Sequence, residues 1–551
     1  KNTSMIRYLV LVFGLIICLN STAQRTVGVL SVDSDNIYDG YNLIYPHNQS
    51  TVFLLDNCGE VVHDWVDLEE TRPGNSVYLL ESGAIAQCKR RASSAVNDPI
   101  WAGGGGETVE IKSWDNDIIS RITINNDSMR FHHDIAPMPN GNILLITWRS
   151  IDSVDCVSAG RDPSLITQGR VWTESILEWN PQTDAIVWEW HIWDHLIQDL
   201  DPNQKNYGIV GFQPERVDFN YDEHDAHPDW LHINAIDYNP VLDQIVVSVP
   251  YFNEFWIIDH STTTQEARSS TGGNSEKGGD LLYRWGNPKT YQAGTDEDQR
   301  LFFQHDVHWI NPDAENGDED FGVIGLFNNR FGHNLSPAHT IPTGYAMLFD
   351  SNIASYDMAQ INNGFMETRI HPDSLNQAYS AGLSSMQVLP NDNWLICAGR
   401  WGYVYELNPE GNVVWEYVVP FKAGQVVNQG VDLGIGNNIT FRAKRFPLDY
   451  PAFEDRVLEP GGVIEIDDEQ SFCNLIVPTV DIERTRQLKL YPNPATNMLY
   501  IEGLNGGTYR IVNNMGELVR EGREESINLS KYHSGIYFLE HNGILSKFLI
   551  Y

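Results

Sequence analysis

The sequence has little positive charge. Its 36 lysines and arginines stand against 74 acidic residues, which gives a formal net charge of −38 over 551 residues. Such a chain repels nucleic-acid phosphates and anionic lipid, so we expect neither as a partner. Strong acidity also keeps an exported protein soluble, and that is the simpler explanation for it.

Long apolar runs are also absent, apart from one near the start of the sequence. Arg7 precedes an apolar run over residues 8–19, and Ser21, Thr22 and Ala23 then supply the small residues of a cleavage site. We therefore expect residues 1–23 to be a signal peptide and the mature protein to be exported. No later run is long enough to predict a transmembrane anchor.

Cysteine is scarce, and its spacing resembles no zinc site. An exported protein can form disulfides, but the number that remains after the signal peptide is odd, so we expect one bridge or none. The five are Cys58, Cys88, Cys156, Cys397 and Cys473.

Long amphipathic helical patterns are rare, whereas glycine and aromatic residues are plentiful, which favours an all-β fold. Turn-forming residues separate apolar runs at several places and predict β-hairpins. Three hairpins end in tryptophan, at residues 55–65, 179–188 and 407–415, and a second kind occurs at 138–146, 237–247 and 388–396. Their recurrence predicts a six-bladed β-propeller over residues 24–477, with a pair of β-sandwiches as the alternative. Residues 218–229 and 261–280 are expected to be long surface loops.

The texture of the sequence changes near its C-terminus. Residues 478–487 form a polar linker, and residues 488–551 form a small β-module of their own. Its opening YPNPA and its later GIYFL closely resemble the C-terminal sorting domain of the type IX secretion system. The resemblance implies a small β-sandwich, the type IX machinery as a partner, and a secreted or cell-surface location. A sandwich module that binds a ligand is the alternative.

Several histidines recur at one point of the repeated units. His133, His232 and Ser384 each stand seven residues before an asparagine of a predicted turn, and His305 takes roughly the same place in its own unit. Equivalent positions in a propeller surround one axis, so we expect these side chains to converge. Imidazole is both a nucleophile and a proton carrier near neutral pH, and further histidines can bind the oxygens of a sulfuryl or phosphoryl group.

Their neighbours are expected on the opposite faces of the strands, because side chains alternate along a strand. Asp134 and Asp306 therefore receive a structural role, and His132 and His308 are treated as spare positions.

Residues 229–240, which contain DWLHIN, and residues 279–288, which contain RWGNP, resemble the bacterial arylsulfate sulfotransferase family. Residues 304–306, 327–329 and 389–396 add to the resemblance. It implies a six-bladed propeller that moves a sulfuryl group between phenols through a sulfohistidine, without a nucleotide donor. No cofactor or metal is implied, and the partners are a phenolic sulfate donor and a phenol acceptor.

The resemblance also assigns roles to single residues. His305 is the implied nucleophile, while His133 and His232 bind sulfate and protonate the leaving phenolate. The implied substrate-binding residues are Asn234, Asn328, Arg330, Ser384 and Ser385.

One departure affects this assignment. The family places a sulfate-binding arginine shortly after the strand of the second histidine, but residues 247–253 contain none. An anionic donor on an acidic protein requires a cation, for which Arg330 and Arg400 are the candidates.

Two other functions remain open on sequence alone. One is a propeller hydrolase or lyase that keeps the histidines but uses a metal or water, and the other is a surface protein that binds sulfated or aromatic ligands. The acidic, histidine-containing residues 222–227 leave a metal site open, and Trp230, Trp285 and Trp309 are candidates for an aryl pocket. No serine-hydrolase elbow, phosphate loop or HExxH motif is present.

Overall fold

The structure is a computed structural model. It describes residues 25–67, 69, 71–91, 98–331, 335–342, 349–350, 355–356, 367–372, 379–466, 489–493, 495–502, 504, 507–513, 518–541 and 544–550. The expected signal peptide (1–23) and linker (478–487) lie outside these residues. The chain divides into two compact units, one ending at Cys473 and the other beginning at Asn474.

Regular structure in the first unit is almost all strand, and its described α-helix is the short α2 (Ser153–Ser158). Short 3-10 turns join the strands at Pro163–Leu165, Ile192–His195, Val210–Phe212, Pro288–Tyr291, Asp296–Asp298, Gly399–Trp401 and Pro451–Phe453. The all-β prediction is confirmed.

The strands form antiparallel sheets of four or five. One sheet contains β2 (Tyr41–Pro46), β3 (Thr51–Leu55), β4 (Val61–Val66) and, from near the end of the unit, β31 (Thr440–Phe446). A second contains β5 (Thr71–Leu79), β6 (Ile85–Arg91), β7 (Thr108–Lys112) and β8 (Ile118–Thr123). A third contains β9 (Met129–Pro137), β10 (Ile143–Asp152), β11 (Arg170–Asn180) and β12 (Ala185–His191).

A fourth sheet contains β15 (Ala235–Asn239), β16 (Gln244–Val249), β17 (Glu254–Asp259) and β18 (Tyr283–Trp285). A fifth contains β19 (His305–Trp309), β20 (Val323–Phe327), β21 (Ala338–Pro342) and β24 (Glu367–Arg369). A sixth contains β25 (Ser385–Val388), β26 (Trp394–Ala398), β27 (Tyr403–Leu407), β28 (Val413–Val418) and β1 (Gly28–Val32). Short pairs lie outside them: β13 (Leu196–Ile197) with β14 (Val217–Asp218), β22 (Phe349–Asp350) with β23 (Ser355–Tyr356), and β29 (Phe421–Lys422) with β30 (Gln425–Val426).

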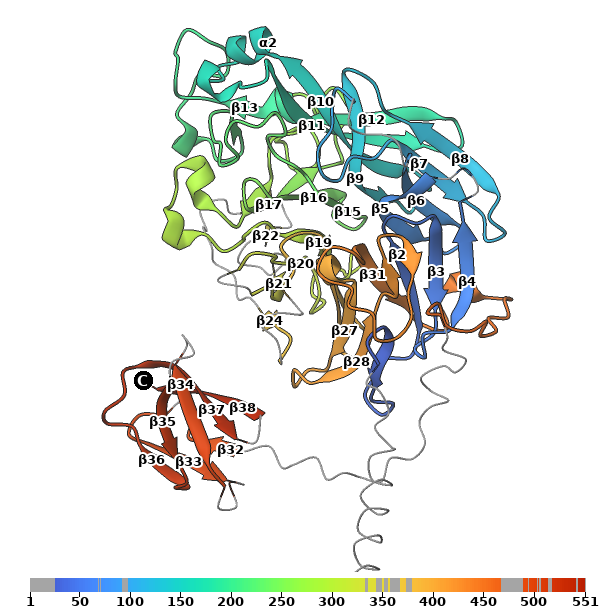
Figure 1. The fold of residues 1–551 in the computed structure, drawn as a ribbon. Helices are drawn as coiled ribbons and strands as arrows, with labels where there is room; N and C mark the ends of the chain where they lie inside the picture. The colour runs from blue at the N-terminus through green and yellow to red at the C-terminus, as the bar shows by residue number, and fades with distance from the viewer. Residues whose placement is uncertain are drawn as a thin grey trace, which may run out of the picture. The chain divides into compact units, whose positions relative to one another are not determined.

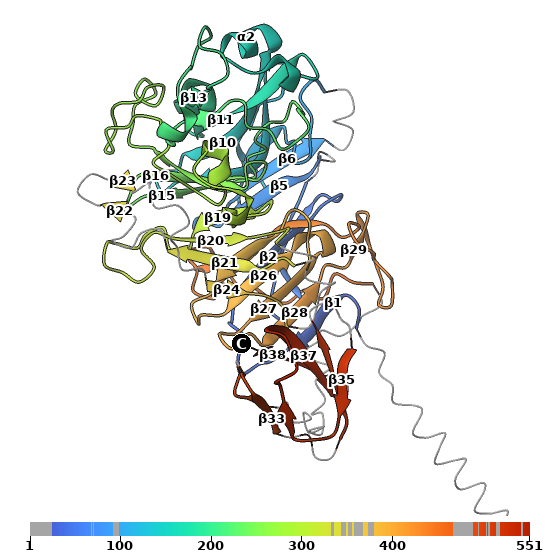
Figure 2. The ribbon, with the colours of Figure 1, turned by 90° about the vertical axis from the view of Figure 1, so that its left-hand side faces the viewer.

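The two ends of this unit are joined by strand pairing. β31, near the end of the unit, pairs with β2, and Figure 1 shows the orange strand beside the blue one. β1 pairs in the same way with β28 (Figure 2). Residues some 400 positions apart thus share one sheet, so the first and last segments of the unit cannot separate without breaking ladder hydrogen bonds.

The predicted hairpins are confirmed, because each falls on two consecutive strands and their turn. The first kind corresponds to β3–β4, β11–β12 and β27–β28, and the second to β9–β10, β15–β16 and β25–β26. Residues 261–280 contain no strand, as expected of a loop.

One strand of each sheet faces the middle of the unit. These strands contact one another in a closed order, β5 to β9, β15, β19, β25, β31 and back to β5. His133 lies in β9 and His305 begins β19, while His232 lies three residues before β15 and Ser384 directly before β25. The repeated position in the sequence therefore corresponds to one level of this central region.

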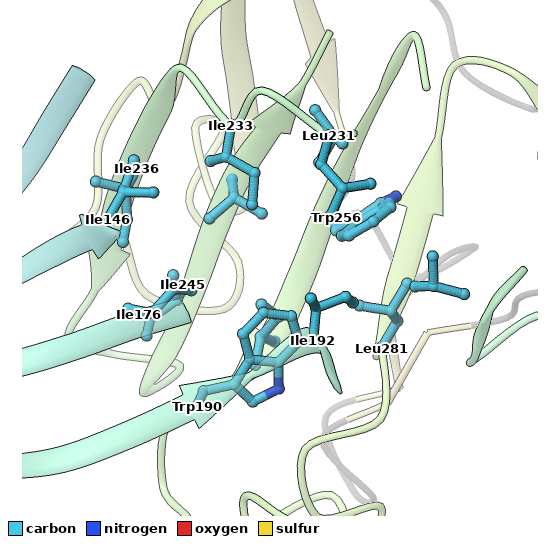
Figure 3. Close-up of a cluster of buried hydrophobic side chains, with 14 of the residues drawn as sticks. Ile146, Ile176, Trp190, Ile192, Leu231, Ile233, Ile236, Ile245, Trp256 and Leu281 are labelled. Carbon is cyan, nitrogen blue, oxygen red and sulfur yellow. The ribbon is translucent and has the colours of Figure 1, made fainter. Parts of the chain in front are cut away.

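A large apolar core holds neighbouring sheets together. Figure 3 shows Ile146 and Ile176 of one sheet against Ile236 and Ile245 of the next. Each side chain is at most 2% exposed, and complete burial of an isoleucine contributes about 1.5–3 kcal/mol. The central strands are therefore held rigidly.

The expected aryl-pocket tryptophans belong to this kind of packing instead. Trp230, Trp285 and Trp309 are 2%, 3% and 2% exposed and lie within apolar cores. Their indole rings fill the space between sheets, so the pocket prediction was wrong for all three.

The second unit consists of two small sheets with one shared core. One contains β32 (Lys489–Tyr491), β33 (Met498–Glu502) and β36 (Ser526–Asn528), and the other β35 (Leu518–Gly522), β34 (Tyr509–Asn513), β37 (Gly535–His541) and β38 (Ile544–Ile550). Leu499, Ile511, Leu539 and Phe548 are fully buried between them.

Cys58 is disulfide-bonded, whereas Cys88, Cys156 and Cys397 are free and buried. One of the described cysteines thus takes part in a bridge, as expected. No helix in the described ranges is both long and apolar enough to span a bilayer.

Candidate active site

Three histidines from three sheets meet in the central region. The rings of His133 and His232 lie 4.5 Å apart, and Phe303 links them to the third because its ring is 6.3 Å from His232 and 5.7 Å from His305. All three imidazoles are at least 90% buried, with exposed fractions of 3%, 8% and 4%. The convergence expected from their register is what the geometry shows.

Each of these histidines uses Nδ1 to bind a protein group. His133 Nδ1 lies 2.8 Å from His132 Nδ1, His232 Nδ1 lies 2.5 Å from Asp229 Oδ2, and His305 Nδ1 lies 2.8 Å from Asn329 Oδ1. The Nε2 atoms of His133 and His232 have no hydrogen-bond partner within the described residues. The common feature of the three rings is thus a protein contact at Nδ1.

The backbone at these positions is unusual. His133 and His232 have φ angles of 51° and 58°, and Leu383 and Ser384 have 63° and 94°. Positive φ is strained for residues other than glycine, and such strain concentrates at functional sites. The β9 ladder shifts register opposite His133, and the β19 ladder shifts directly after His305.

Asn329 fixes the tautomer of His305. Its Nδ2 donates to the carbonyls of Ser380 (2.7 Å) and Leu383 (2.8 Å), so its Oδ1 must be the atom that faces the imidazole. His305 Nδ1 therefore carries a proton, and Nε2 keeps a lone pair, which accepts the Leu383 amide at 3.0 Å. Burial lowers the pKa of His305 to about 3, so the ring is neutral at physiological pH. A neutral Nε2 with an oriented lone pair is a competent nucleophile.

His232 is paired with a buried carboxylate. Although burial opposes it, the neighbouring His232 lowers the pKa of Asp229 below its usual value, so this carboxyl group is ionised. Asp229 is 1% exposed, and a charge so deeply buried requires a partner. The contact with Asp229 fixes the orientation of the His232 ring.

A glycine-rich loop, residues 102–106, covers His133. A Cβ at Gly104 would lie 1.9 Å from His133 Nε2, and Gly104 has a φ of 80°, so only glycine is accommodated there. Its carbonyl accepts the His133 amide (2.8 Å) and the Asn75 side chain (2.6 Å). The four consecutive glycines are the feature of the sequence that could have indicated this close approach.

His132 is not a spare position. Its Nε2 lies 2.7 Å from Glu174 Oε2, its ring stacks on Trp148 at 4.0 Å, and it is fully buried. The positive φ of His133 interrupts strand alternation, so the two consecutive histidines turn toward one another. Burial and then the charge of Asp229 raise the pKa of Glu174 well above its usual value.

His308, by contrast, is held within its own strand. Its Nδ1 bonds the Asp306 carbonyl at 2.7 Å, and burial lowers its pKa to about 4.

The aspartates that follow two of the histidines have the structural role expected of them. Arg442 of β31 binds Asp134 at 2.8 Å and Asp306 at 2.5 Å. Asp134 also accepts the Ile236 amide, and Asp306 accepts the Met386 amide. This network, 0–3% exposed, joins the central strands β9, β19 and β31.

The remaining predicted residues bind the surrounding backbone. Asn234 Nδ2 donates to the Gln304 carbonyl, while its Oδ1 is buried without a partner in the described chain. Asn328 holds the loop before His305, accepting the Phe302 amide and donating to the Arg300 carbonyl. The hydroxyls of Ser384 and Ser385 bond the Gly399 amide and the Ala443 backbone.

A pocket of about 310 Å³ lies beside the histidines. It is lined by Glu223, His224, Pro250, Tyr251, Asn253, Gln299, Phe302, Phe303 and Arg330. Tyr251 stacks on His232 at 4.8 Å, and the Arg330 guanidinium lies 3.7 Å above the Phe303 ring. The pocket therefore combines aromatic walls with a cation next to the imidazoles.

Arg400 adds a second cation. A Cβ on Gly382 would lie 3.6 Å from Arg400 Nη2 and 3.7 Å from Phe303, which places Arg400 on the same side of the site. Its guanidinium makes no hydrogen bond or ion pair with any described residue. Both arginines are exposed and therefore accessible to a ligand.

The described residues contain no group of three or more His, Cys, Asp or Glu side chains arranged to hold a metal. His224 of the acidic segment instead stacks on Tyr251 at 3.9 Å.

Residues 29–419 match the Arylsulfotransferase (ASST) family, and residues 489–548 match the secretion system C-terminal sorting domain. No curated protein matches the chain significantly. The sorting domain indicates export through type IX secretion, to the cell surface or the extracellular space, and so implies that machinery as a partner.

Solved structures resemble the chain only distantly. A protein of unknown function from Bacteroides caccae is 10% identical with a TM-score of 0.38, and the match covers 74% of this chain and 99% of that one. A streptogramin B lyase is 10% identical with a TM-score of 0.33 and coverages of 78% and 96%. Virginiamycin B lyase from Staphylococcus aureus is 10% identical with a TM-score of 0.30 and coverages of 76% and 98%. Scores this low support no conclusion about fold or function.

The family match spans well over half of the sequence and contains all three converging histidines, so the chain belongs to the arylsulfotransferase (ASST) family.

Proposed function

We propose that this protein is a six-bladed β-propeller that transfers a sulfuryl group from an aryl sulfate to a phenol through a sulfohistidine on His305. The closed order of contacts among six central strands supports the propeller. The observation that carries the chemistry is the tautomer of His305, whose Nε2 lone pair lies beside two further imidazoles.

In the first half-reaction, His305 Nε2 attacks the sulfur of the donor. The N–S bond forms as the bond between sulfur and the aryl oxygen breaks, and the phenolate leaves with that electron pair. The phenolate takes a proton from the neighbouring imidazoles. Attack requires Nε2 to release the Leu383 amide, which can then donate to a sulfuryl oxygen.

In the second half-reaction, the acceptor phenol attacks the sulfur. The new O–S bond forms, the N–S bond breaks, and the phenolic proton passes to the imidazole that lost one. His305 returns to its neutral tautomer, with Asn329 bound to its Nδ1–H throughout. No nucleotide or metal is needed for either step.

The positive charge that binds sulfate comes from more than one place in this proposal. Arg330 lines the pocket, and Arg400 lies on the same side of the site near Phe303. Together they replace the arginine that residues 247–253 lack.

Acceptor dependence tests the proposed function. We expect the mature protein to release phenol from 4-nitrophenyl sulfate rapidly only when a phenol acceptor is present, with the acceptor recovered as its sulfate ester. Equal release without acceptor supports a hydrolase, and saturable binding without release supports a binding protein. Either result contradicts the transferase.

Substitution of Arg330 tests whether the cation that lines the pocket binds the donor. Arg330→Met is expected to raise KM for the donor roughly tenfold with a smaller change in kcat, because a hydrogen bond to a charged group contributes about 1.5–3 kcal/mol. Arg268→Met is the matched control, since Arg268 is 50% exposed and paired with Glu189. An unchanged KM for Arg330→Met would remove this residue from the donor site.

A further inference from the structure

A chain of hydrogen bonds extends from His133 into the protein interior. His133 Nδ1 faces His132 Nδ1 at 2.8 Å, His132 Nε2 faces Glu174 Oε2 at 2.7 Å, and Glu174 Oε1 accepts the Ile233 amide at 3.1 Å. His132 and Glu174 are fully buried, so water does not compete for these contacts. The reaction assigned above does not require this chain beyond His133.

The chain allows two proton arrangements. Two imidazole nitrogens at hydrogen-bond distance share one proton, so only one of the two Nδ1 atoms is protonated. When Glu174 is protonated it donates to His132 Nε2, His132 Nδ1–H donates to His133 Nδ1, and His133 carries its single ring proton on Nε2. When Glu174 is ionised, His132 carries its proton on Nε2 and donates to Glu174, and His133 carries its proton on Nδ1 and donates to His132. His133 Nε2 then has a free lone pair.

We propose that Glu174 and His132 form a proton relay behind His133, in which Glu174 supplies the proton for the leaving phenolate and recovers it from the acceptor. This inference rests on the proposed function.

The steps balance in both directions. As the aryl oxygen leaves sulfur, His133 Nε2–H passes its proton to the phenolate, His132 passes one to His133 Nδ1, and Glu174 passes one to His132 Nε2. The negative charge of the donor is then on Glu174, and sulfated His305 is a zwitterion. Attack by the acceptor phenol reverses each transfer.

The surroundings favour this arrangement over an imidazolium acid. Burial, followed by the nearby His232 and His132, lowers the pKa of His133 well below its usual value, so a second proton is costly to hold on this ring. Burial and then the charge of Asp229 raise the pKa of Glu174 well above its usual value. When one of two neighbouring carboxyl groups has a raised pKa and the other a lowered one, the first typically donates a proton and the second stays ionised.

The test compares two donors. Phenyl sulfate has a basic leaving group that needs a proton, whereas 4-nitrophenyl sulfate releases a stable anion. In Glu174→Gln, the amide can still donate to His132 but cannot transfer a proton. We expect kcat/KM for phenyl sulfate to fall on the order of 10²-fold or more, with a much smaller loss for the nitrophenyl donor.

Two further variants make the result decisive. His132→Phe keeps the stacking on Trp148 and removes both nitrogens, and it should give the same selective loss, with no further loss in the double variant. Glu178→Gln changes the next inward-facing glutamate of β11, which binds His260 and Asn142, and should leave the ratio of the two donors unchanged.

Equal losses for both donors, or none, would overturn the relay. Wild-type protein that turns over neither donor would instead overturn the proposed function, so the two failures are distinguishable. Thermal unfolding of each variant identifies any that fail to fold, and the remaining variant then decides.

Discussion

Replacement of His305 is expected to abolish sulfuryl transfer. His305→Ala removes the only imidazole of the three that Asn329 and Leu383 together hold with an oriented Nε2 lone pair. Loss of a nucleophile costs on the order of 10⁴-fold or more in kcat. The measurement is phenol release from an aryl sulfate with a saturating acceptor, and an unchanged rate would contradict the assignment.

A second measurement detects the intermediate itself. Wild-type protein incubated with donor and no acceptor is expected to gain the mass of one sulfuryl group, on the peptide that contains His305. His305→Gln is expected to preserve the fold, since the glutamine amide can donate to Asn329 and accept from Leu383. It should fold, bind donor and remain unmodified.

His308→Gln is the matched control, because this histidine lies in the same strand and its Nδ1 contacts only Asp306, at the carbonyl (2.7 Å) and the carboxylate (3.7 Å), among the described residues. It should retain turnover and become sulfated like the wild type. Sulfation of His308→Gln together with loss of sulfation in His305→Gln would locate the intermediate on His305 rather than on the other histidine of β19.

Local chemistry explains why the fold could be predicted. The turns at 56–60, 138–142 and 408–412 contain Asn, Asp, Gly or Pro, whose backbone preferences form a hairpin whatever surrounds it. Recurrence of these hairpins then indicates a repeated sheet. The pairing of β31 with β2 depends on residues about 400 positions apart and has no local signature.

The site could be predicted only in part. Register identified His133, His232 and His305, since equivalent positions of successive sheets reach the same level. Strand alternation failed at His132, because His133 has a φ of 51° and the two rings meet.

The sequence also could not show which of two adjacent asparagines contacts His305. Asn328 and Asn329 have the same side chain, and only the fold shows that Asn329 reaches His305 while Asn328 holds the preceding loop. In the same way, the aromatic pocket uses Tyr251 and Phe303, whereas the tryptophans named for it fill the core.

The second large effect concerns stability. Arg442→Leu is expected to lower the free energy of unfolding by about 3–5 kcal/mol, because it leaves two buried carboxylates without their cation. Asp134 and Asp306 are 0% and 2% exposed, and both bind Arg442. The measurement is the midpoint of urea unfolding, followed by tryptophan fluorescence.

Part of the lost stability should be recovered when the two carboxylates are neutralised, which would show that the loss comes from uncompensated charge rather than from packing. Adding Asp134→Asn and Asp306→Asn to Arg442→Leu removes the uncompensated charges, so the triple variant should be more stable than the single one. Arg268→Leu, at an exposed ion pair, should change the free energy by at most about 1 kcal/mol. If the triple variant were less stable than Arg442→Leu, the network would act through hydrogen bonds to the Ile236 and Met386 amides. Those bonds fix the strands that carry the histidines, so loss of activity would then accompany loss of stability.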